Sequence, residues 1–102
     1  MQTGSAALYA VEGCKNFGLC DRMQRAAVSI ASNIAEGSER GTAAEFRQFL
    51  TYAKGSAAEL RTQIHIACLV GMLQEQDGSA FIAELTEIAR MLEGLRRSLK
   101  KK

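Results

Sequence analysis

Residues 17–37 read FGLCDRMQRAAVSIASNIAEG, and this stretch decides the fold. Its apolar residues recur at steps of three and four, which places them on one stripe of a helix. That stripe comprises Leu19, Met23, Ala27, Ile30 and Ile34. A polar row of Ser29, Asn33 and Glu36 runs beside it. The alanines of this stretch let another backbone approach closely, so we expect tight packing against neighbouring helices.

The composition of the whole chain predicts a single all-α domain over residues 1–102. A chain of 102 residues fits one domain with a core of its own. Proline and tryptophan are absent, and the abundant Ala, Leu, Glu, Arg and Gln all favour helices. Beta-branched residues nowhere alternate with polar ones over a strand length, so the sequence gives little support to a sheet.

Helical periodicity and turn residues divide the chain into four expected helices. These cover about residues 5–12, 18–36, 42–70 and 79–99. Gly37 is expected to end the second in a left-handed conformation, Gly71 to stop the third, and Asp77 or Ser79 to cap the last. Short loops between long helices predict an antiparallel up-and-down four-helix bundle with a short or truncated first helix.

The third and fourth helices have the clearest patterns. Thr42 followed by Glu45 fits a capping box, which predicts a helix start. The expected inner face of this helix is Phe46, Phe49 or Leu50, Ala53, Ala57, Leu60, Ile64 and Ala67. Gly55 costs about 1 kcal/mol relative to alanine inside a helix, so we interpret it as a sign of close helix contact. The last helix has a heptad seam of Phe81, Leu85, Ile88, Leu92, Leu95 and Leu99.

Charge and cysteine usage bear on the setting of the protein. The formal net charge is +2, and the basic tail over 96–102 supplies five of the positive charges. Such a tail can contact nucleic acid, remain solvated, or complement the dipole at a helix C-terminus. Cys14, Cys20 and Cys68 make an odd number, and no leader pattern precedes them, so we expect a cytoplasmic protein. No segment is apolar enough to predict a membrane span.

Candidate catalytic and metal-binding groups are few. His65 and Cys68 lie three apart, but a zinc site needs three or four ligands, so we predict no metal site. Ser29, Ser32 and Asn33 have no histidine base on their own helix. Glu36 and Glu59 fit solvated carboxylates or salt-bridge partners better than an acid pair. We predict no catalytic residues and no cofactor.

A more regular polar pattern runs along the third helix. Arg40, Arg47, Lys54 and Arg61 repeat every seven residues and form a row of cations. Such a row could follow a phosphate backbone. It could equally be the solvated side of a helix, because glutamates lie close to it and Tyr52 is the one nearby aromatic residue.

Four segments together resemble a family of four-helix-bundle proteins first noticed within intervening sequences of bacterial 23S rRNA genes. They are FGLCDRMQRAAVSIASNIAEG at 17–37, EFRQFL at 45–50, AKGSAAELRTQ at 53–63 and MLEGLRRSL at 91–99. The resemblance covers nearly the whole chain after Leu8. The accessory variability protein of diversity-generating retroelements is similar to that family.

The resemblance implies a bundle that assembles into a homopentameric barrel. In the retroelement relatives it implies a basic surface that engages nucleic acid and a reverse transcriptase. The motif positions in this chain are Arg22, Arg25, Ser29, Ser32, Asn33, Glu36, Gly37, Phe46, Phe49, Gly55, Ser56, Glu59 and Gln63. Family members usually have a longer first helix, and many have proline where this chain has Ala31, so its second helix should be straighter.

Polar groups on the two alanine-rich helices need partners if they are buried. We therefore expect an inter-helix network of Ser29, Asn33, Glu36, Ser56, Glu59 and Gln63. It could fix the register of the bundle or of a subunit contact.

Two functions follow as hypotheses. The first is a non-enzymatic homo-oligomer, pentameric by the resemblance, that binds RNA or DNA beside a polymerase-type partner. Its expected contacts are Arg40, Arg47, Lys54, Arg61, Arg96, Arg97 and Lys100. The alternative is an assembly or protein-interaction module without nucleic-acid binding. An enzyme is disfavoured because no set of nucleophile, base and orienting group is found.

Overall fold

The computed structural model describes residues 17–99, and every regular element in this range is an α-helix. The helices are α2 (Phe17–Ser38), α3 (Ala43–Leu69) and α4 (Glu75–Ser98). The all-α prediction is confirmed for this part of the chain. The predicted helix over residues 5–12 and the end of the basic tail, residues 100–102, lie outside the described residues.

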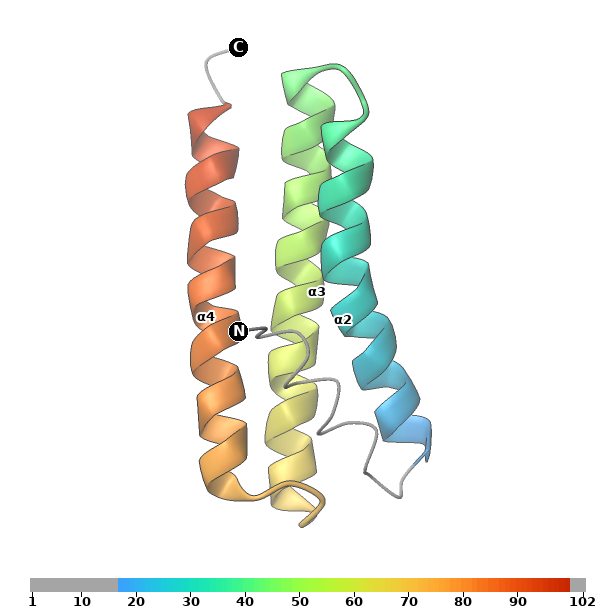
Figure 1. Ribbon diagram of the computed structural model, residues 1–102, viewed down its shortest axis with the longest axis vertical. Coiled ribbons are helices and arrows are strands. Elements are labelled where there is room, and N and C mark those ends of the chain that lie inside the picture. The colour runs from blue at the N-terminus through green and yellow to red at the C-terminus, as the bar shows by residue number, and fades with distance from the viewer. Residues whose placement is uncertain (1–16, 100–102) are drawn as a thin grey trace.

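The three helices run up, down and up, with α3 in the middle (Figure 1). Each outer helix packs mainly against α3, and α2 and α4 contact each other little. The short connections at 39–42 and 70–74 force this antiparallel course, as expected from loops of that length. The inner face of α3 is therefore shared between two neighbours.

The core lies along the inner face of α3 and has two clusters of buried residues. The first joins Cys20, Met23 and Ala26 of α2 to Leu60, Ile64 and Ala67 of α3 and Leu85 of α4. The second joins Leu50 and Ala53 of α3 to Leu92 of α4. The predicted inner face of α3 is confirmed, with Leu50 fully buried and Phe49 half-buried. Within the predicted α4 seam, Leu95 is instead 40% exposed.

Side-chain capping fixes the start of α3. The Glu45 amide donates to Thr42 Oγ1 at 3.1 Å, as a capping box requires. The Thr42 hydroxyl donates in turn to Glu45 Oε1 at 3.1 Å, so the glutamate returns to the threonine side chain. The predicted capping of α3 is confirmed.

The predicted ends at two other helix termini are wrong in detail. α2 continues through Gly37 to Ser38, and the left-handed glycine is Gly41, with φ of 90°. α4 begins at Glu75, and Gln74 is its N-cap without a side-chain hydrogen bond, in place of Asp77 or Ser79. Glu75 and Asp77 lie in the first turn, where negative charge favours a helix start without a capping side chain.

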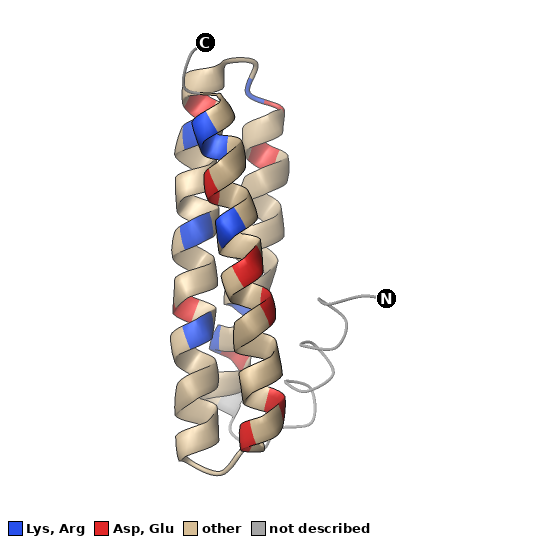
Figure 2. Cartoon of the chain, turned by 90° about the vertical axis from the view of Figure 1, so that its left-hand side faces the viewer, with Lys and Arg blue, Asp and Glu red and all other residues tan. Residues whose placement is uncertain are grey.

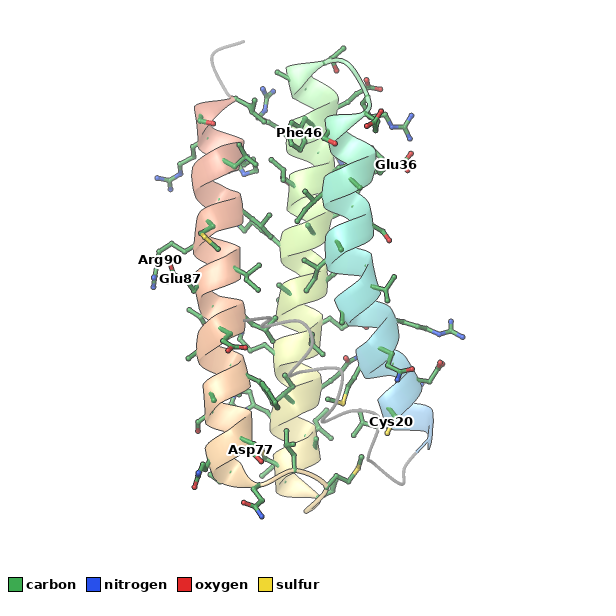
Figure 3. All side chains as sticks on the ribbon, in the orientation of Figure 1. Cys20, Glu36, Phe46, Asp77, Glu87 and Arg90 are labelled. Atoms are coloured by element: carbon green, nitrogen blue, oxygen red, sulfur yellow. The ribbon has the colours of Figure 1, made fainter. Side chains whose placement is uncertain are left out.

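Gly37 is the glycine that permits close contact between α2 and α3. A Cβ atom added to it would lie 2.6 Å from Phe49 Cβ and 3.0 Å from Phe46 Cδ1. Figure 3 shows Phe46 at the end of α3 that lies beside the end of α2. Gly55 is different, because it is exposed and an added Cβ would meet nothing within 4 Å. The predicted close contact at Gly55 is therefore wrong within one subunit.

Candidate nucleic-acid interface

The cationic row of α3 divides between the two sides of the molecule. Figure 2 shows basic and acidic bands interleaved along α3 and α4. Arg40 lies in the turn before α3, where it pairs with Glu36 at 3.0 Å and covers the Phe49 ring at 4.9 Å from its centroid. Arg47 and Lys54 instead contact α4. Arg61 is half-buried on α3.

Glu93 of α4 accepts hydrogen bonds from three cationic side chains. Its carboxylate accepts from Lys54 Nζ of α3 at 2.7 Å. It also accepts two bonds from Arg96, through Nε and Nη2, both at 2.9 Å. Arg97 Nε donates to it at 3.0 Å. Three cations from two helices thus share one carboxylate, and the forked Arg96 contact has the geometry of the stronger charge-assisted pairs.

Arg47, near the start of α3, completes the group by contacting the C-terminal end of α4. Its Nη1 donates to the Leu99 carbonyl oxygen at 3.0 Å. Arg47, Glu93, Arg96 and Arg97 line a hollow of about 490 Å³. We call Arg47, Lys54, Arg96 and Arg97 around Glu93 the basic cluster. Four cations face one anion there, so the cluster carries an excess of positive charge.

The electrostatics of Glu93 follow from these contacts. Hydrogen bonds from Arg96, Lys54 and Arg97 hold the pKa of its carboxyl far below the ordinary 4.5. The same contact, through its hydrogen bond and its charge, raises the pKa of Arg96. Glu93 is therefore ionised at any physiological pH, and it fixes the side chains of its three partners near one point.

The structure places four of the seven predicted nucleic-acid contacts together in the basic cluster. Arg40 pairs with Glu36 instead, and Arg61 neither lines the hollow nor bonds to Glu93. Lys100 lies outside the described residues. Sequence reasoning missed Glu93 as the organising residue. The signal was its spacing of three and four before Arg96 and Arg97, which predicts ion pairs on one helix face. The contact with Lys54 depends on how α3 and α4 align and has no local signal.

The expected polar network is reduced to one bond between α2 and α3. Ser29 Oγ and Ser56 Oγ lie 2.8 Å apart. Asn33 Nδ2 donates within α2 to the Ser29 carbonyl oxygen at 2.8 Å and to Ser29 Oγ at 3.0 Å. Gln63 Nε2 donates to Glu59 within α3 at 3.3 Å, and its buried Oε1 has no hydrogen-bond partner. Glu36 turns outward to Arg40 (Figure 3).

The cysteine and histidine side chains of the described residues form no metal-binding group. No cluster of three or more His, Cys, Asp or Glu side chains that could hold a metal occurs between residues 17 and 99. Cys68 is a free thiol, and burial followed by the charges of Glu75 and Asp77 raises its pKa. A raised pKa makes this thiol less reactive. Cys20 is disulfide-bonded.

The fold and the site define a small helical-bundle protein with a basic cluster at one end of the α3 and α4 pair. The family model described as 23S rRNA-intervening sequence protein matches residues 6–94, and the chain belongs to this family. A comparison with curated proteins finds no match. Among the described helices, none combines the length and the apolar character needed to cross a membrane.

Proposed function

We propose that this protein is a non-enzymatic, homo-oligomeric helical-bundle protein that binds RNA or DNA through the basic cluster. The observation that carries the proposal is the gathering of four cations from two helices around Glu93. Arg47, Arg96 and Arg97 line the hollow with Glu93, and Lys54 donates to the Glu93 carboxylate. Phosphate contacts by Lys and Arg supply most of the affinity of non-specific nucleic-acid binders. The Arg47 guanidinium is already held on the Leu99 carbonyl oxygen, so it loses less side-chain entropy when it binds.

The proposal extends to the finer features that the family resemblance implies. The bundle has a short first helix before α2, the subunits form a pentamer, and a polymerase-type protein is a partner. A cytoplasmic location belongs to the same proposal. The disulfide at Cys20 counts against that location, because disulfides are rare in a reducing compartment.

A pair of matched double variants tests nucleic-acid binding. Arg47→Gln with Arg97→Gln removes two charges from the basic cluster. Arg25→Gln with Arg90→Gln removes two exposed charges outside the cluster, which pair with Asp21 and Glu87. We expect the first variant to bind a labelled oligonucleotide about tenfold more weakly at low salt, with a shallower dependence of log affinity on log salt.

The control variant should keep at least most of the wild-type affinity. An equal loss in both double variants would mean that only net charge matters and would contradict the assignment to the basic cluster. Titrations with single-stranded RNA and with duplex DNA distinguish the two ligands, and the slope should be about −0.7 and −0.9 per phosphate contact, respectively.

An assembly module without nucleic-acid binding is the second candidate, and the outward face of α3 favours it. Positions along this face follow steps of three and four, are all exposed and carry no charge: Ala44, Gln48, Thr51, Gly55, Ala58, Thr62, Ile66 and Leu69. Leu69 is 84% exposed at its end. A solvated helix face ordinarily carries charged residues, so this face fits contact with another copy of the chain. If wild-type protein is not retained on nucleic acid at low salt, the assembly module is the function that remains.

A further inference from the structure

The Glu93 carboxylate lies where a phosphate bound to the basic cluster would compete with it for the same Lys and Arg donors. Its side chain is 23% exposed and is reached by cations from both α3 and α4. A carboxylate and a phosphate present the same kind of anionic oxygens to Lys and Arg donors. In the described structure the carboxylate therefore occupies the place among the cations that a phosphate oxygen would take.

The three partners of Glu93 differ in how firmly they are held. Arg96 makes two hydrogen bonds, and its side chain is 36% exposed. Lys54 and Arg97 make one bond each to Glu93, and Arg97 is 75% exposed. Lys and Arg side chains are long and flexible, so a ligand can take over a single bond more easily than a forked pair. Arg97 and Lys54 are thus the donors that a phosphate can recruit.

We propose that Glu93 is an internal counter-ion which competes with nucleic-acid phosphate for Lys54 and Arg97 and so limits the affinity of the basic cluster. The inference rests on the proposed function, because it names the regulation of that same site. A ligand gains contacts to these two cations only as it displaces their bonds to Glu93. The carboxylate therefore lowers affinity for any phosphate ligand.

Glu93→Gln tests this inference, with Glu87→Gln as its matched control. Both changes remove one negative charge from α4, and both carboxylates pair with an arginine on the same helix. Glu87 and Arg90 point away from α3, as Figure 3 shows. Binding of a labelled single-stranded oligoribonucleotide is measured by fluorescence anisotropy over a salt series from about 50 to 200 mM.

Glu93→Gln is expected to bind about three- to tenfold more tightly than wild type at low salt. The slope of log affinity against log salt should steepen by about one phosphate contact. Glu87→Gln should stay within about twofold of wild type, because its charge lies outside the cluster. Thermal unfolding of both variants checks that they are folded. If Glu93→Gln does not fold, Glu93→Asp keeps the charge but retracts it, and a smaller gain in affinity is expected.

Three results would overturn the inference. Weaker binding by Glu93→Gln, with wild type still binding, would mean that Glu93 positions the cations for the ligand. Equal gains in the two variants would reduce the effect to net charge. Absence of binding by wild type and by both variants would remove the proposed function itself and the inference with it.

Discussion

Gly37 sets how closely the end of α2 approaches α3. Its position is buried, and any side chain would meet the Cβ atom of Phe49 before it met solvent. Gly55 and Gly94 are also helical, but the space around each is open. Glycine is therefore sterically required at Gly37, whereas neither the space nor the helical backbone requires it at Gly55 and Gly94. The sequence alone does not distinguish the glycine that is sterically required from the two that are not.

Alanine substitutions at Gly37 and Gly94 should change the free energy of unfolding in opposite directions. Gly37→Ala is expected to lower the free energy of unfolding by about 1–3 kcal/mol, because Phe49 or the α2 backbone has to shift. Gly94→Ala should raise it by about 0.5–1 kcal/mol through helix propensity alone. Urea unfolding followed by circular dichroism measures both. A Gly37→Ala protein as stable as wild type would show that the contact with Phe49 relaxes without cost.

At the scale of the helices, features set by local sequence could be predicted, and features set by contacts between helices could not. The capping box at Thr42 and the inner face of α3 are local patterns, and both were recovered. The start of α4 was missed because Gln74 provides no side-chain cap to recognise. The row of cations on α3 was visible as a seven-residue repeat, whereas the contact of Lys54 with Glu93 spans 39 residues and depends on tertiary packing. Periodicity identifies a face but not the residue opposite it.

The contact between α3 and α4 should weaken in acid. Because the pKa of Glu93 lies below its ordinary 4.5 in the folded protein, its contribution to stability is present above that value. The contribution is lost as pH falls through the lowered pKa. Wild type should therefore exceed Glu93→Gln in stability near neutral pH, and the difference should narrow below pH 4.5. Chemical denaturation of both proteins over a pH series gives the difference, which would be constant with pH if the ion contacts contributed nothing.

For the whole molecule, α2 and α4 dock on one side of α3, and within residues 17–99 no helix packs against its outward face. Small residues on the inner face, such as Ala53 and Ala57, are buried. Ala58 and Gly55 on the outward face are exposed. Residue spacing predicted the inner face of α3, but it did not single out the uncharged outward face as a second surface for contact. That distinction follows from where α2 and α4 dock.

Assembly through the outward face of α3 can be tested with two exposed glycines. Gly55→Glu places a charge in the centre of the uncharged face, where the subunit leaves open space. We expect the oligomer to dissociate toward the monomer in sedimentation velocity while helix content is retained. Gly94→Glu makes the same change at an equally open position on α4. It should leave the mass of the assembly unchanged.

A monomeric wild-type protein at all concentrations would contradict the assembly proposal. An intact oligomer in Gly55→Glu would show that copies meet through another surface, and the exposed Val28, Met91 and Leu95 would then be the next residues to change.

The central position of α3 determines how far the effect of a core substitution extends. Since α2 and α4 depend on α3 and touch each other little, α3 acts as the spine of the molecule. A substitution on the buried face of α2 or α4 chiefly loosens the contact of that helix with α3. A substitution at Ile64 or Leu50 of α3, by contrast, loosens packing against both outer helices at once.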